Sequence, residues 1–140
     1  MKYMRYIVII FSFLMSISAI AQKPKCKKFK DGDFTYFDPQ LPDYEVEMSR
    51  NGNVQTEFNP FFQGKVISKV VWKSDCEYEL IYEKFEGFLF SMDDSIGDSV
   101  HCRILETYGK DAYKVHAKSN AKDPGRIIMI TRVGATPPKP

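Results

Sequence analysis

Apolar and polar residues alternate along most of the chain beyond residue 43, which is the pattern of β-strands with one buried and one wet face. The clearest example is the stretch 76–83, where Tyr78, Leu80 and Tyr82 alternate with glutamates at 77, 79 and 83. Helical periodicity is nearly absent elsewhere in this part of the chain. The pattern therefore predicts an all-β domain made of short strands.

Turn residues separate these alternating runs and predict antiparallel hairpins between them. Seven or eight strands in so short a chain favour an antiparallel meander that closes into a small β-barrel, because closure removes exposed strand edges. A two-sheet β-sandwich is the alternative. The expected strands span residues 44–49, 54–58, 66–73, 76–83, 100–108, 112–117 and 126–133.

The first predicted hairpin turns at Asn51-Gly52-Asn53. A three-residue loop would place Met48 opposite Thr56, whereas a two-residue Asn-Gly loop would place Met48 opposite Gln55. We expect the three-residue loop, because it keeps the apolar residues of both strands on one face.

Residues 84–99 break the alternation. Phe85, Phe88, Leu89 and Met92 follow the i, i+3, i+4, i+7 spacing of a helix. This segment is expected to be a short helix or a lid.

Residues 1–21 have the features of a signal peptide: Lys2 and Arg5, an apolar run over 6–20, and small residues Ala19 and Ala21 before the cleavage point. We expect export to the periplasm or the exterior, with no membrane span after cleavage. The remainder divides into a single β domain, 22–134, and a proline-rich tail, 135–140, that is expected to be disordered.

Charge excludes one class of partner. The signal peptide holds two of the 20 basic residues and none of the 18 acidic ones, so residues 22–140 carry no net formal charge. A nucleic-acid binder needs a surplus of Lys and Arg, so we expect no nucleic-acid partner. The lysine-rich stretch 23–30 is expected to be a solvated, frayed end.

Three cysteines in an exported chain indicate a disulfide, and three pairings are possible. We favour Cys26 with Cys76, which ties the N-terminal segment to the start of a strand. Cys102 is then a free thiol packed on an apolar strand face.

Catalytic and metal chemistry have weak support. A Cys102 and His116 pair on neighbouring strands could form a nucleophile and base, but alternation favours outward histidines at 101 and 116 and a buried thiol. The acidic stretch 93–98 lacks the glutamate that a calcium loop needs at its twelfth position. We expect no enzyme, no metal and no cofactor.

Residues 26–34, Arg50, residues 55–57 and the Val-Trp-x-x-x-Cys-x-Tyr-x-Leu run at 71–80 resemble a family of short exported proteins of flavobacterial type. That resemblance implies no established activity. Some relatives carry the label of a topoisomerase IV subunit, which a short, neutral, exported chain does not support. Size, meander and Trp72 near a strand end also resemble lipocalin-like barrels, although the usual Gly-x-Trp opening is missing.

The resulting hypothesis is a non-enzymatic, lipocalin-like barrel that binds an apolar or amphipathic small molecule. Arg50 lies at a position comparable to the interior arginines of fatty-acid-binding barrels, although its place beside a turn favours a solvent-facing guanidinium. The candidate ligand-binding residues are Arg50, Trp72, Tyr78, Tyr82 and Tyr108.

A second hypothesis follows from the 16 aromatic residues beyond residue 21, several of which lie outside the predicted strands. Exposed rings at Phe61 and Phe62, or at Phe85, Phe88 and Phe90, would serve a protein-interaction module at the cell envelope.

Overall fold

The structure is a computed structural model that describes residues 23–138. The predicted signal peptide and the last two residues of the predicted tail lie outside the described residues.

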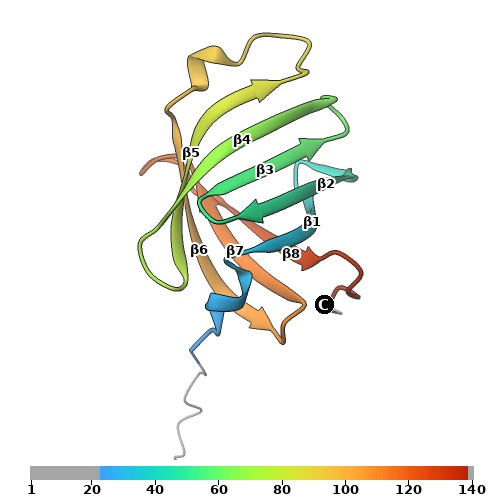
Figure 1. Cartoon of the computed structure of the whole chain (residues 1–140), viewed down its shortest axis with the longest axis vertical. Coiled ribbons are helices and arrows are strands. Elements are labelled where there is room, and N and C mark those ends of the chain that lie inside the picture. The colour runs from blue at the N-terminus through green and yellow to red at the C-terminus, as the bar shows by residue number, and fades with distance from the viewer. Residues whose placement is uncertain (1–22, 139–140) are drawn as a thin grey trace, which may run out of the picture.

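Eight antiparallel strands form one closed barrel in sequence order, as Figure 1 shows. Each strand pairs with the next, and β8 pairs with β1. This is the closed meander predicted from the sequence, and it fits a lipocalin-like barrel and excludes the sandwich. The strands are β1 (Gly32–Asp38), β2 (Leu41–Asn51), β3 (Val54–Asn59), β4 (Gly64–Trp72), β5 (Glu77–Glu86), β6 (Ser99–Tyr108), β7 (Ala112–Lys118) and β8 (Arg126–Arg132).

Strand β1 closes the barrel and was not among the predicted strands. It pairs with β2 on one side and with β8 on the other, where Tyr36 lies opposite Ile130. Phe34 is fully buried, whereas Phe37 is 51% exposed on the outer face. That outward phenylalanine blurs the alternation, which explains why the sequence pattern did not reveal the strand.

The β2–β3 hairpin differs from the expected three-residue loop. Asn51 pairs with Val54, so the loop is Gly52-Asn53 and Met48 lies opposite Glu57. Gly52 has a φ of 60°, which suits the first central position of a type II′ turn. The shift in register turns Gln55 and Glu57 into the barrel and leaves Val54 40% exposed.

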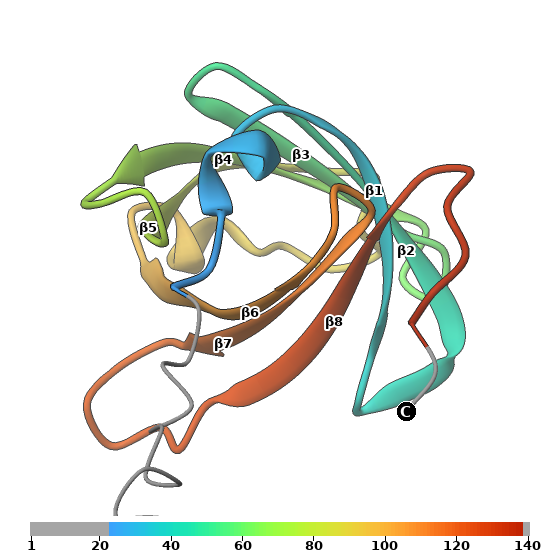
Figure 2. The same ribbon diagram turned by 90° about the horizontal axis from the view of Figure 1, so that it is seen from below.

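A short 3₁₀ helix, η1 (Cys26–Phe29), lies across one end of the barrel, as seen in Figure 2. Its Phe29 ring is fully buried, 4.7 Å from the ring of Tyr113 between centroids. We call this the closed end. The expectation of a frayed N-terminal segment is therefore wrong for η1, because the Phe29 side chain anchors it in the core.

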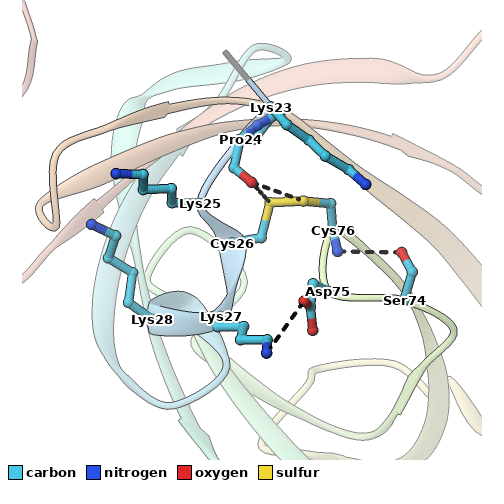
Figure 3. Close-up of a pocket in the computed structure, with 9 residues that line it drawn as sticks. All are labelled: Lys23, Pro24, Lys25, Cys26, Lys27, Lys28, Ser74, Asp75 and Cys76. Atoms are coloured by element: carbon cyan, nitrogen blue, oxygen red, sulfur yellow. Dashed lines mark hydrogen bonds and ion pairs between the residues drawn. A yellow bond between two sulfur atoms is a disulfide. The ribbon is translucent and has the colours of Figure 1, made fainter.

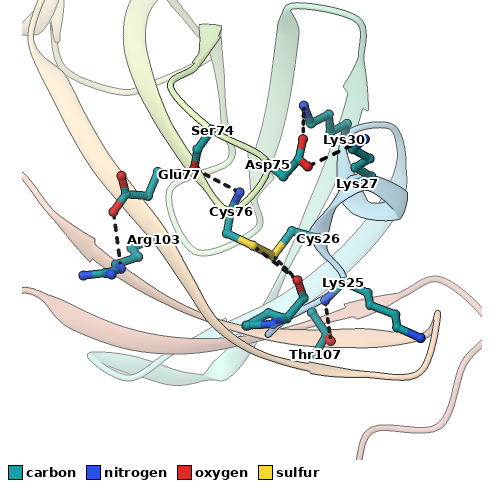
Figure 4. Close-up of a disulfide and its surroundings, with 11 residues drawn as sticks. Lys25, Cys26, Lys27, Lys30, Ser74, Asp75, Cys76, Glu77, Arg103 and Thr107 are labelled. Atoms are coloured by element: carbon teal, nitrogen blue, oxygen red, sulfur yellow. Dashed lines mark hydrogen bonds and ion pairs between the residues drawn. A yellow bond between two sulfur atoms is a disulfide. The ribbon is translucent and has the colours of Figure 1, made fainter. Parts of the chain in front are cut away.

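The predicted disulfide between Cys26 and Cys76 is confirmed, with the two Cα atoms 5.2 Å apart (Figure 4). It joins η1 to the β4–β5 turn. The same turn is held to β6 by a hydrogen bond from the Ile104 amide to the Cys76 carbonyl, 2.8 Å long. The disulfide thus fixes η1 over the closed end.

Residues 84–99 do not form the helix that their spacing allowed. Strand β5 continues to Glu86, and the following loop contains only one 3₁₀ turn, η2 (Asp93–Ser95). The Phe88 ring packs directly on Gly64, where an added Cβ would approach the ring to 2.5 Å. The missing side chain at Gly64 therefore makes room for the Phe88 ring.

Candidate functional site

The closed half of the barrel is filled with side chains. Phe29, Phe34 and Tyr113 pack against one another with ring centroids 4.7 to 6.4 Å apart. Arg50 and Tyr78 lie beside them and are almost fully buried. This half of the barrel is therefore core, and the space for a ligand must lie farther along the barrel axis.

Arg50 is the most unusual residue of this core, because its side chain is charged and only 2% of the residue is exposed. Its Nε and Nη2 donate to Gln55 Oε1 at 2.8 and 2.5 Å, and its Nη1 donates to the Phe29 carbonyl at 2.9 Å. The guanidinium carbon lies 4.5 Å from the centroid of the Tyr78 ring. The expectation of a solvent-facing guanidinium is therefore wrong, because the chain supplies three hydrogen bonds and aromatic faces inside the barrel.

Gln55 connects Arg50 to an interior carboxylate. Its Nε2 donates to Glu57 Oε1, while its Oε1 faces the guanidinium. The second carboxylate oxygen, Glu57 Oε2, accepts a hydrogen bond of 2.7 Å from the Tyr36 hydroxyl. Arg50, Gln55, Glu57 and Tyr36 thus form one network, which we call the lumen network. Its positive end lies at the closed end and its negative end lies farther along the lumen.

The other half of the barrel contains a cavity of about 170 Å³, which we call the lumen cavity. Aliphatic side chains supply much of its wall, and Glu57, Tyr36 and Gln55 bring the polar end of the lumen network to it. The remaining polar lining residues lie on or next to the ends of β1, β7 and β8 and form its mouth: Asp38, Lys118, Ser119, Asp123 and Arg126. The aliphatic residues are Met48, Leu80, Val100, Val115, Ala117, Ile128 and Ile130.

The negative charge of Glu57 reaches several groups of this cavity. Burial, and then the Glu57 charge, raise the pKa of Tyr36 well above its ordinary value. The same two causes, in the same order, raise the pKa of Tyr82 to about 12 and the pKa of the Cys102 thiol to about 12. All three groups are therefore protonated and neutral at physiological pH.

Two of the five predicted ligand-binding residues line the lumen cavity, namely Tyr78 and Tyr82. Arg50 lies behind Gln55 at the closed end. Trp72 packs against Tyr78, with ring centroids 4.6 Å apart. Tyr108 lies at the far end of β6, where its hydroxyl donates to Glu106 at 2.8 Å in an exposed position.

Cys102 and His116 are not brought together. Cys102 pairs in register with Ala117, and both line the lumen cavity. His116 lies on the other face of β7, with its Nε2 2.9 Å from the Pro124 carbonyl oxygen. The buried thiol therefore has no imidazole base in this position, and its pKa of about 12 keeps it protonated.

A second hollow lies outside the barrel, beside the disulfide (Figure 3), and shares no lining residue with the lumen cavity. It is lined by lysines at 23, 25, 27 and 28 together with Asp75. Lys27 is 80% exposed at its side chain and already contacts Asp75 at 3.8 Å. Such solvated lysines bind weakly and without geometric selection, so this hollow is a poor site compared with the lumen cavity.

An aromatic cluster lies between the β3–β4 and β5–β6 loops, with Tyr44 of β2 at its edge. Its rings are in sequential contact with centroids 4.9 to 6.3 Å apart. Phe61 is 48% exposed, Phe90 is 54% exposed, and the neighbouring Leu89 is 95% exposed. The cluster consists of Tyr44, Phe61, Phe62, Phe88 and Phe90.

Sequence reasoning missed Gln55, Glu57 and Tyr36 as lumen residues. The run Val54, Thr56 and Phe58 reads as the apolar face of β3, so its polar partners were assigned to solvent. One signal was available: Arg50 continues the inward face of β2, and a buried guanidinium requires acceptors on the neighbouring strand.

The disulfide indicates an oxidising, exported environment. Within residues 23–138, no helix is both long and apolar enough to cross a bilayer. No protein-family model, curated protein or solved structure matches this chain.

Proposed function

We propose that this chain is an exported, non-enzymatic barrel that binds a small apolar or amphipathic molecule in its lumen. The observation that carries the proposal is the lumen cavity of about 170 Å³, whose wall combines aliphatic and tyrosine side chains with polar groups at Glu57 and at the mouth. Binding sites for small molecules have this composition. The sequence resemblance to lipocalin-like barrels agrees with the barrel fold, and the resemblance to exported flavobacterial proteins agrees with export.

The size of the cavity limits the ligand. A protein cavity of about 150 Å³ accommodates benzene, so 170 Å³ holds one small ring or a short branched chain. A longer ligand would keep its remaining length at the mouth, where polar residues such as Ser119 and Lys118 are available. The segment 85–92 would act as a lid over the neighbouring edge of the barrel, where Phe88 packs on Gly64.

Toluene is a suitable probe for this proposal, because it matches the cavity in size and has no polar group. We expect saturable binding by calorimetry to the disulfide-bonded protein. Ile128→Trp should abolish that binding, because Ile128 lines the cavity and the indole would occupy the space. Ile127→Trp is the matched control, because Ile127 is 56% exposed on the outer face of the same strand.

Equal loss of toluene binding in both variants, or no binding to the wild-type protein, would contradict a lumen site. Thermal melts of both variants show whether each is folded before its binding is interpreted.

The aromatic cluster supports a second candidate function, a protein-interaction module at the envelope. Contiguous exposed rings are typical of the centre of a protein interface. Under this proposal, Phe61→Ser with Phe90→Ser should remove one stoichiometric partner that co-purifies from the host envelope, whereas Ile127→Ser should retain it. Identical co-purifying proteins in all three samples would count against this candidate.

A further inference from the structure

The lumen cavity has a negatively charged group in its wall, the Glu57 carboxylate. Glu57 lines the cavity, and its two oxygens accept one hydrogen bond each, from Gln55 and Tyr36. Among the ion pairs formed within residues 23–138, none involves Glu57. An ionised carboxylate offers about four acceptor positions, so the Glu57 carboxylate has capacity for a further donor.

Arg50 is close in the lumen network but does not neutralise this carboxylate directly. Its three donors are directed to Gln55 Oε1 and to the Phe29 carbonyl, which are both on the closed side of the network. The Gln55 amide stands between the two charges, with its oxygen toward Arg50 and its nitrogen toward Glu57. A ligand in the cavity therefore meets the carboxylate and not the guanidinium.

The other charged residues of the cavity are at the mouth. Arg126 is paired with Asp38, with Nη1 2.7 Å from Oδ2, and Asp123 accepts hydrogen bonds from Ser119. Among the lining residues that the structure describes, Lys118 is the other cation. Including Glu57, the lining carries three carboxylates and two cations, so its formal charge is negative.

The tyrosine rings of the cavity favour the same kind of ligand. Tyr36, Tyr78 and Tyr82 line the cavity around Glu57. Aromatic faces attract cations, and this attraction increases when water is excluded. A carboxylate with neighbouring aromatic rings in an aliphatic cavity is a suitable site for a protonated amine.

We propose that the ligand of the lumen cavity is a small amphipathic amine whose ammonium group pairs with Glu57 while its ring or short chain packs on the aliphatic wall. This inference rests on the proposed function and specifies its ligand class. It also reverses the ligand polarity that the sequence comparison of Arg50 with fatty-acid-binding barrels suggested.

Three probes of similar size and different charge test the inference: phenethylamine, 2-phenylethanol and 3-phenylpropionate. We expect the amine to bind at least about tenfold more tightly than the alcohol, as a charge-assisted hydrogen bond in a desolvated site would give. We expect 3-phenylpropionate to bind more weakly than the alcohol, because Glu57 repels it. Calorimetry with the wild-type protein is sufficient for this comparison.

Glu57→Gln should remove the preference for the amine, bringing the affinities for the amine and the alcohol to within about threefold of each other. Glu47→Gln is the control of equal charge, because Glu47 is exposed on the outer face of β2, and it should retain the preference. If Glu57→Gln does not fold, the relative affinities of the three probes for the wild-type protein still test whether Glu57 binds an ammonium group.

Equal binding of amine and alcohol to the wild-type protein, or tightest binding of 3-phenylpropionate, would overturn the assignment of Glu57 while toluene binding still supported a lumen site. Failure of all probes, toluene included, would remove the proposed function as well.

Discussion

Arg50→Ala is expected to lower the free energy of unfolding by about 3 to 5 kcal/mol, the largest effect of any single substitution we consider. The Arg50 guanidinium makes three hydrogen bonds in a site where only 2% of the residue is exposed. Alanine would leave Gln55 Oε1 and the Phe29 carbonyl buried without donors, and it would also leave an empty space beside Tyr78. Urea denaturation monitored by circular dichroism measures the change.

Arg103→Ala provides the control for this substitution. Arg103 is 65% exposed at its side chain and contacts Glu77 at 3.3 Å, so its removal should cost less than about 1 kcal/mol. The loss of stability in Arg50→Lys should fall between those of the two alanine variants. Lysine keeps the charge but lacks the planar guanidinium that donates to Gln55 and to the Phe29 carbonyl at the same time. An Arg50→Ala protein as stable as Arg103→Ala would show that the lumen network does not stabilise the fold.

Loss of the disulfide is expected to have a comparable effect. Cys26 and Cys76 close a loop of 50 residues, and the chain-entropy relation for that length gives about 4 kcal/mol. We expect Cys26→Ala with Cys76→Ala to lower the free energy of unfolding by that order, and to release η1 from the closed end. Hydrogen exchange should then rise first at η1, because η1 is a single turn held by the disulfide, by the Phe29 ring and by two hydrogen bonds, from Arg50 and Arg132.

Reduction of the wild-type protein gives an independent measurement of the disulfide's contribution to the free energy of unfolding. Reduction breaks the bond without changing the side chains that surround it. The reduced protein and the double variant should agree to within about 1 kcal/mol. If both were as stable as the oxidised protein, packing and the hydrogen bonds from Arg50 and Arg132 would hold η1, and the disulfide would contribute little to stability.

The lumen network explains why a small barrel keeps a charged residue in its core. The hydrogen bonds of Arg50 connect β2, β3 and η1, since Phe29 belongs to η1 and Gln55 to β3. The network therefore connects η1 at the closed end to the wall of the lumen cavity. An apolar residue at position 50 could fill the same space but could not orient Gln55, and through it Glu57.

The barrel and its disulfide could be predicted because both depend on features that short stretches of the sequence contain. Inward residues such as Tyr78 and Leu80 alternate with charged ones, and this alternation specifies a strand without knowledge of its neighbours. Cys26 and Cys76 were assigned from the expected export and from the position of Cys76 at a strand start. These inferences do not require the register of any hairpin.

The interior polar residues could not be predicted in the same way, because they depend on register. A turn at Gly52-Asn53 in place of Asn51-Gly52-Asn53 changes which face of β3 is buried, so Gln55 and Glu57 are inside and Val54 is outside. The strongest apolar alternation in β3 thus belongs to its outer face. Only the pairing of Arg50 with Gln55 across the two strands resolves that ambiguity.

Intermolecular nuclear Overhauser effects between toluene and methyl-labelled protein would show whether the ligand lies on the inner or the outer face of β7 and β8. A ligand in the lumen cavity should give contacts from toluene to the methyl groups of Ile128 and Val115, which line the cavity, and none to Ile127. Contacts to Ile127 or to the aromatic cluster, with none to Ile128 and Val115, would contradict a lumen site.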